Sequence, residues 1–304
     1  MKAVKNILIL ADADDKLDHL LERAKILATS FQASISIFMN KPNVLSADSA
    51  APRSLAHRLF KTQQRQFAEH YQQQLENIGQ RFQAEGIKVR TEFSSAKNHY
   101  ESILGAITRF KPDLTLKSIQ RHNALRRIII SNTDWQLIKD CASPLLLIKR
   151  QNWQAEGSII AAVDPLHAKA QQNELDHLIL DTSRALAAKL ELNIRVFHNY
   201  LPDITHLFPK VLDADDYIRE VHDRHQEKLL ELLAEHDLTV DSLLLTRGDL
   251  VKALLSCIRK QQANILVLGA LSRNFVERAI VGSTAERILY DTPCDVLVLK
   301  NDSN

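Results

Sequence analysis

The chain has 304 residues, and at about 150 residues per domain this length predicts two domains. Its formal net charge of +2, with 45% apolar and 25% charged residues, excludes a strongly basic protein that coats nucleic acid. The three widely spaced cysteines, Cys141, Cys257 and Cys294, exclude a disulfide framework or a zinc cassette, so we expect a reducing compartment, the cytoplasm.

The first half alternates apolar strands with amphipathic helices. The N-terminal apolar run is short and meets an acid at Asp12, so it predicts a strand rather than a signal peptide. No apolar run approaches the roughly 20 residues that a membrane helix needs. The pattern predicts strands at 5–11, 33–38, 87–93, 112–117 and 144–149, and helices at 14–30, 54–84, 98–110 and 133–140.

The second half follows the same plan. It predicts strands at 158–163, 191–197, 239–245, 264–268 and 295–299, and helices at 170–189, 213–236, 249–261 and 283–290. Gly86 and Gly248 predict breaks, and Asp249 predicts a helix N-cap. The strands are rich in Ile, Leu and Val with few polar interruptions, which indicates a parallel sheet covered by helices on both faces.

An internal repeat relates the two halves. Residues 5–38 correspond to residues 157–197, and the tetrapeptide LDHL occurs at 17–20 and again at 175–178. Similar matches join the ends of the halves, at an offset that stays between about 151 and 158 residues. We therefore predict two tandem α/β domains, 1–150 and 151–304, each a doubly wound parallel sheet of flavodoxin-like order 3-2-1-4-5.

In such a fold, ligands bind beyond the carboxyl ends of the strands, where the strand order reverses. In the second half this edge would hold Asp164, Gly269, Ser272 and the helix start Gly282-Ser283-Thr284. A glycine there lets the backbone approach a phosphate, and the hydroxyls and N–H groups of a helix start can bind its oxygens. Alternatively, Gly282 is only a turn residue, and Ser283 or Thr284 only an N-cap.

The corresponding loop of the first half has no glycine. Lys117 is expected in the place of Gly269, and 131–133 in the place of 282–284. The loop carries a basic cluster, Arg121, Arg126 and Arg127 with His122, which either binds an anionic group or an acidic partner, or is a solvated surface. The adjoining isoleucines, 128–130, are expected to pack on the sheet or on the other half.

Few other residues indicate chemistry. His222 and His225, three residues apart on one helix, could share a cation, although such a pair is more often a surface feature, so no metal site is predicted. No Ser-His-Asp or Cys-His arrangement predicts a catalytic residue. Cys141 and Cys294 are expected to be small buried residues, and Trp135 and Trp153 to serve in packing.

Taken together, these residues resemble the tandem universal stress protein family, and its E-type branch most closely. ATP-binding members carry a glycine, two residues, a glycine, nine residues, then Gly-Ser or Gly-Thr. Gly269, Ser272, Gly282 and Ser283 follow that spacing, with Ser272 in place of the second glycine, and Asp12 and Asp164 match the acid that closes the first strand. The stretches 112–117, 132–149 and 266–300 are similar to corresponding parts of E-type proteins.

The resemblance implies a cytoplasmic protein induced by starvation, oxidants or DNA damage. It implies ATP or a related nucleotide as the ligand of the second half and none in the first. It also implies that the two halves pair through their fifth strands, 145–149 and 296–300, with further dimerisation left open.

The leading hypothesis is therefore a stress-response binding protein that is not an enzyme. One alternative is a protein that binds an acylated or anionic ligand, or only other proteins. Another is a weak ATPase in which Asp164 contacts a metal or ribose, although no base is evident for activating water. Neither a nucleic acid nor a membrane is expected as a partner.

Overall fold

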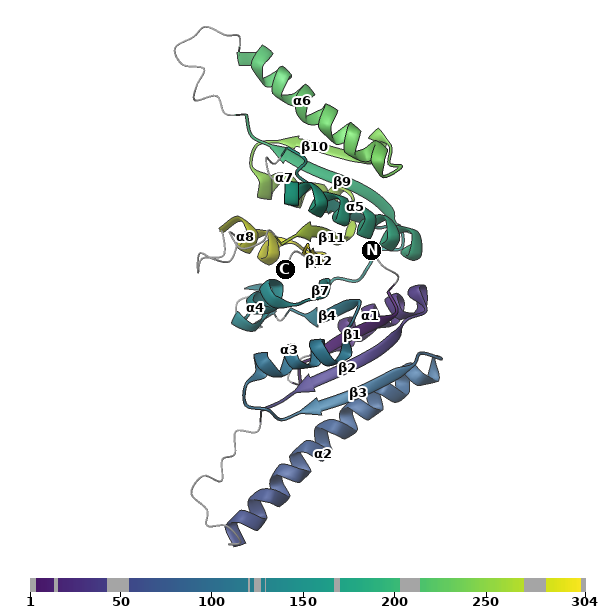
Figure 1. Cartoon of the computed structure of the whole chain (residues 1–304), viewed down its shortest axis with the longest axis vertical. Helices are drawn as coiled ribbons and strands as arrows, with labels where there is room; N and C mark the ends of the chain where they lie inside the picture. Colours follow the sequence, from purple (N-terminus) through teal and green to yellow (C-terminus); the bar gives the residue numbers. More distant parts are fainter. Residues whose placement is uncertain are drawn as a thin grey trace. The chain divides into compact units, whose positions relative to one another are not determined.

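The computed structural model describes residues 4–13, 16–42, 55–119, 121–122, 127–128, 130–166, 170–202, 214–270 and 283–301 (Figure 1). The chain divides into two compact units, Lys2–Arg150 and Gln151–Asn304. Each unit is a five-stranded parallel sheet with helices between successive strands, and each is described below by itself.

The first unit contains the strand order 3-2-1-4-5 that the sequence predicted. The sheet runs β3-β2-β1-β4-β7, with every neighbouring pair parallel. Its elements are β1 (Asn6–Ala11), α1 (Asp18–Phe31), β2 (Ser34–Asn40), α2 (Leu55–Ala84), β3 (Val89–Ser94), α3 (His99–Phe110), β4 (Leu114–Ser118), α4 (Asn132–Asp140) and β7 (Leu145–Ile148). Between β4 and α4, where only a loop was expected, β5 (Arg121–His122) and β6 (Arg127–Ile128) form a short antiparallel hairpin.

The second unit repeats this order as β10-β9-β8-β11-β12, again all parallel. Two expected strand boundaries of this unit are wrong by three residues or more. The second strand ends at Tyr200 rather than at 197, and the third begins at Leu243 rather than at 239, because Val240–Ser242 form a 3₁₀ turn (η2). In the first unit, the first helix likewise begins at Asp18 rather than at 14. The remaining elements are β8 (Ser158–Ala162), α5 (Ala170–Leu190), β9 (Asn193–Tyr200), α6 (Ala214–Glu235), β10 (Leu243–Arg247), α7 (Leu250–Lys260), β11 (Ala263–Gly269), α8 (Ser283–Asp291) and β12 (Asp295–Leu299).

Right-handed crossovers fix which helices share a face of each sheet. Moving from the first strand to the third, the helices α1 and α2 lie on one face, and moving back across the sheet, α3 and α4 lie on the other. In the second unit α5 and α6 take the first face, and α7 and α8 the second. The central strands are consequently buried on both sides, as in β1, where Ile7, Leu8 and Ile9 are fully buried.

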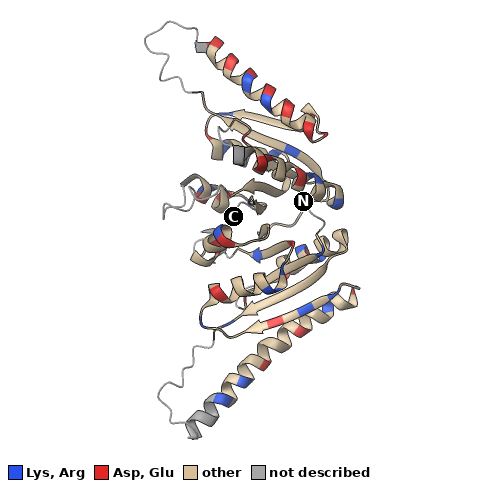
Figure 2. Ribbon diagram, in the orientation of Figure 1, with Lys and Arg blue, Asp and Glu red and all other residues tan. Residues whose placement is uncertain are grey.

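The longest helices, α2 and α6, carry charges of both signs along their length, whereas the strands are mostly uncharged (Figure 2). Among the helices in the described part of the chain, none combines the length and apolar character that crossing a bilayer requires.

Local signals in the sequence are borne out at several helix ends. Gly86 and Gly248 have φ of +79° and +107°, which explains glycine at both breaks. Asp249 caps α7, since its side chain accepts from the backbone N–H of Lys252 at 2.8 Å. In the first unit, Asn98 caps α3 in the same way.

Two cysteines and one tryptophan were expected to serve in packing rather than in chemistry. Cys141 and Cys294 are buried, as predicted. Trp153 donates its indole N–H to Asp295 at 2.8 Å, which fixes the segment that leads into β8. Trp153 thus serves in packing, as predicted.

Candidate functional site

The carboxyl ends of the central strands were predicted to form the ligand site. The strand order reverses between β1 and β4 in the first unit and between β8 and β11 in the second. At these edges Asp12 follows β1 directly, and Asp164 follows β8 after one residue, Val163. The two edges therefore occupy the same place in the strand order, and their described side chains differ.

Strand register corrects one expected equivalence between the edges. Leu116 pairs with Ile9, and Val267 pairs with the repeat partner of Ile9, Ala161. Lys117 therefore corresponds to Leu268, and Ser118, not Lys117, corresponds to Gly269. Because side chains alternate along a strand, Lys117 points to the face opposite that of Gly269, toward α3 and α4.

In the first unit, Lys117 forms a buried ion pair. Its Nζ lies 3.1 Å from Oδ1 of Asp134, and the two side chains are 10% and 4% exposed. Asp134 is also the third residue of α4, where its Oδ2 accepts from the backbone N–H of Ser131 to complete a capping box. The second unit has Leu268 and Ala285 at the corresponding positions, so these two positions carry a charge pair in the first unit and apolar residues in the second.

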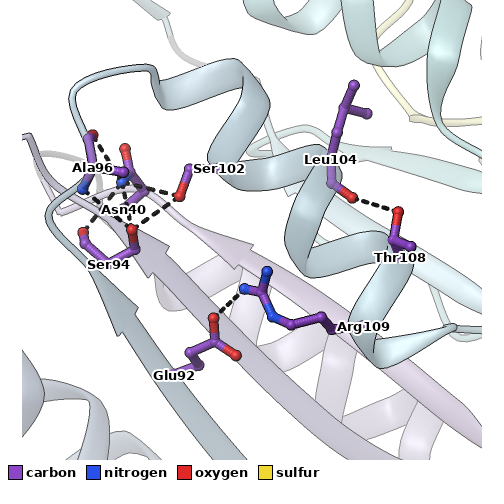
Figure 3. Close-up of polar contacts among 8 residues, drawn as sticks. All are labelled: Asn40, Glu92, Ser94, Ala96, Ser102, Leu104, Thr108 and Arg109. Atoms are coloured by element: carbon purple, nitrogen blue, oxygen red, sulfur yellow. Dashed lines mark hydrogen bonds and ion pairs between the residues drawn. The ribbon is translucent and has the colours of Figure 1, made fainter.

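A hydrogen-bonded cluster adjoins the ion pair. His99 Nδ1 lies 2.8 Å from Asn40 Oδ1, an acceptor, so Nδ1 carries the proton. The amide nitrogen of Asn40 donates to the main chain of Ser94 and Ala96 and to the Ser102 hydroxyl (Figure 3). Burial, and then the charge of Lys117, lowers the pKa of His99, which keeps the ring neutral at pH 7.

These side chains leave little space at the edge of the first unit. The cavity there measures about 10 Å³, enough for one water molecule. Apolar and polar groups line it together: Leu10, Ala11, Asp12, Phe38, Asn40, His99, Ile103 and Lys117. A drug-sized ligand needs roughly 300 Å³ or more, so a nucleotide does not fit inside this cavity.

In the second unit, the turn at Asp164 is held from two sides. The backbone N–H of Asp164 donates to Asp176 Oδ1 of α5 at 3.1 Å. On the other side, His198 Nδ1 of β9 lies 2.9 Å from the carbonyl oxygen of Val163 and must donate to it. The Asp164 side chain itself is 52% exposed, with Oδ1 3.8 Å from His198 Nδ1. A half-exposed carboxylate thus stands on a fixed backbone.

The two histidines of α6 extend this arrangement. His225 Nδ1 lies 2.8 Å from His198 Nε2, and His222 Nδ1 lies 2.9 Å from the Tyr200 hydroxyl. The His225 ring stacks between those of His198 and Tyr200, with centroids 5.0 and 4.7 Å away. Burial and the neighbouring His198 lower the pKa of His225. The histidine pair therefore ties α6 to β9.

Metal ligation finds no support in this cluster. Across the described ranges, no group of three or more His, Cys, Asp or Glu side chains is arranged to hold a metal ion. His222 and His225 were expected either to share a cation or to lie on the surface, and in the structure both turn toward β9.

Gly269 has a packing explanation that the sequence did not supply. A Cβ atom added at this residue would lie 2.3 Å from Cδ2 of Leu175, which packs against the backbone from α5. A side chain at residue 269 would therefore have to displace Leu175, whether or not a phosphate approaches. Ser272 and Gly282 lie outside the described residues, while Ser283 begins α8 and Thr284 is exposed in its first turn.

The basic cluster falls on the β5–β6 hairpin. Arg121 pairs with Ile128, and His122 pairs with Arg127, in antiparallel register. Arg126 lies outside the described residues. The role predicted for Arg121, Arg126 and Arg127 stays a prediction.

Comparison with known proteins agrees with the tandem arrangement. The family model described as "Universal stress protein family" matches residues 3–149 and 159–300. A relative named Universal stress protein E, from Photorhabdus laumondii, is 26% identical over 229 residues and is matched over 71% of this chain and 70% of its own length. A Haemophilus influenzae relative, named Universal stress protein E homolog, is 20% identical and is matched over 97% of both chains.

Among solved structures, a universal stress protein from Pseudomonas aeruginosa aligns with a TM-score of 0.75 at 21% identity, covering 99% of this chain and 94% of that one. At this identity the likeness establishes the fold. The family models cover nearly the whole sequence and match it twice in succession. The chain belongs to the universal stress protein family, as a tandem member with two copies of its domain.

Proposed function

We propose that the protein is a stress-response binding protein that holds ATP or a related nucleotide at the carboxyl edge of β8 and β11. The observation that carries this proposal is the contrast between the two edges. Asp164 stands half exposed on a fixed backbone, whereas Lys117 and Asp134 occupy the same edge of the first unit. The Asp164 carboxylate can accept from ribose hydroxyls, and the start of α8 supplies N–H groups for phosphate.

The proposed role is binding without turnover. Hydrolysis needs a base with a free lone pair beside the attacking water. Among the described residues, His198 is the imidazole with a nitrogen 3.8 Å from the Asp164 carboxylate, and its two ring nitrogens are engaged by the Val163 carbonyl and by His225. We therefore expect no catalytic role for His198.

The first test uses ATP binding and the internal repeat. Asp164→Ala should weaken ATP binding, measured by titration calorimetry, by about tenfold or more, since a hydrogen bond to a charged group contributes roughly 1.5–3 kcal/mol. The matched variant Asp12→Ala in the first unit should leave the affinity unchanged.

A small molecule that stays bound through purification, identified by mass spectrometry after denaturation, would give the ligand directly. Unchanged affinity in both Asp164→Ala and Gly282→Val would contradict the assignment of the second unit. An acylated or other non-nucleotide anion would favour the alternative ligand class and direct attention to Arg121, Arg126 and Arg127.

We propose further that the protein supports survival under oxidative or DNA-damage stress, as its family membership suggests. The cytoplasmic location and the pairing of the two units through their fifth strands stay predictions.

A further inference from the structure

Asp176 is a buried carboxyl group whose second oxygen lacks a partner. The residue is 6% exposed and lies inside α5. Its Oδ1 accepts from the backbone N–H of Asp164, but Oδ2 is buried and takes part in no hydrogen bond. An ionised carboxylate in this position loses its hydration at Oδ2 without compensation, whereas a protonated acid does not carry the charge into the interior.

The charged groups around Asp176 favour the same conclusion. The turn after β8 presents Asp164, a second carboxylate, while His198 of β9 directs its nitrogens to Val163 and His225. The nearby end of β11 is Gly269, against which Leu175 packs. The pKa of Asp176 is raised to about 7, because burial and the negative charge of Asp164, which raise it, together outweigh the backbone hydrogen bond from Asp164, which lowers it.

The internal repeat contains a natural comparison. Asp18 occupies the corresponding place in the LDHL tetrapeptide of the first unit, but α1 begins at Asp18, whereas α5 begins six residues before Asp176. Asp18 is exposed and Asp176 is buried. The same sequence therefore gives a solvated helix-start acid in one unit and a buried acid beside the candidate site in the other.

We infer that Asp176 binds a proton at Oδ2 and that this proton regulates the second unit's site by setting the charge beside Asp164. This inference rests on the proposed nucleotide function. With the proton bound to Asp176, only Asp164 of this pair carries a negative charge near the ligand. After the proton is lost, both Asp164 and Asp176 carry a negative charge and repel an anionic ligand. Nucleotide affinity should then fall as the pH rises through neutrality.

The titration can be measured without any nucleotide. The pKa of Asp176 is about 7 in the folded state, against the usual 3.8, so the folded state keeps this proton up to a higher pH than the unfolded state does. The free energy of unfolding therefore falls as the pH rises through 7. Between pH 6 and pH 8 the folding equilibrium constant should fall about tenfold relative to Asp176→Asn, which resembles the protonated acid. Denaturant unfolding of the full chain measures this difference.

Asp18→Asn is the matched control and should follow the parent protein at both pH values. A carbon chemical-shift titration of the Asp176 carboxyl should show a midpoint near 7. A midpoint near 4, with equal pH dependence of stability in parent and Asp176→Asn, would overturn the inference.

Regulation is tested by ATP titrations at pH 6 and pH 8. The parent should lose at least about threefold more affinity than Asp176→Asn over this interval. ATP's own titration cancels, because the same ligand binds both proteins. Equal losses in both proteins would overturn regulation even if Asp176 titrates near 7. Absence of ATP binding to every form at both pH values would instead overturn the proposed function, and the regulatory role with it.

Discussion

Asp134→Asn is expected to destabilise the first unit by about 3–5 kcal/mol. The substitution leaves the Lys117 ammonium buried without the carboxylate that lies 3.1 Å away, and breaking a buried ion pair from one side has this order of cost. The asparagine side chain keeps an oxygen that can cap the helix, so the loss of unfolding free energy comes mainly from the broken charge pair. Urea unfolding followed by circular dichroism measures it.

The second unit supplies the control for this experiment. It has Leu268 and Ala285 where the first unit has Lys117 and Asp134. The double variant Lys117→Leu/Asp134→Ala should therefore recover stability to within about 1–2 kcal/mol of the parent, the remainder being the lost cap. A double variant as unstable as Asp134→Asn would show that the ion pair is not the source of the loss.

Gly269→Val is expected to destabilise the second unit by about 1–3 kcal/mol, since it forces a side chain into the space that Leu175 occupies. Leu175→Ala removes the opposing group, so the two changes together should cost at least about 1 kcal/mol less than the sum of the separate losses. The same unfolding measurement on the parent, the two single variants and the double variant completes this double-mutant cycle. Strict additivity would contradict direct contact as the reason for glycine at this residue.

Most of the fold could be predicted from the sequence because its strands and helices carry strong, locally consistent patterns. Fully apolar strands such as 145–148 and 295–299 indicated a sheet covered on both faces, and the helix bounds agree within a few residues. The doubly wound fold class supplied the strand order, and the repeat indicated that both units share it. The late start of β10 was missed, because a short 3₁₀ turn has no apolar periodicity of its own.

The site was harder to predict, because its decisive features are contacts between distant residues. Aligning 112–117 with 263–269 by sequence made Lys117 equivalent to Gly269. Only the strand register shows that the two differ by one residue. The spacing of Ser131 and Asp134 predicts a helix cap, but nothing local reveals the lysine that approaches from β4. Asp176 was missed because its repeat partner, Asp18, has the same neighbours in sequence and a different depth in the structure.

The double role of Asp134 affects how each unit opens locally. In the first unit, one carboxylate caps α4 and holds Lys117, so unwinding the first turn of α4 also exposes a buried charge. The amides of that turn should exchange with deuterium through openings that involve β4 as well. In the second unit, α8 has alanine at the corresponding position, so its first turn can fray by itself. A single carboxylate thus makes one end of an otherwise repeated fold open cooperatively.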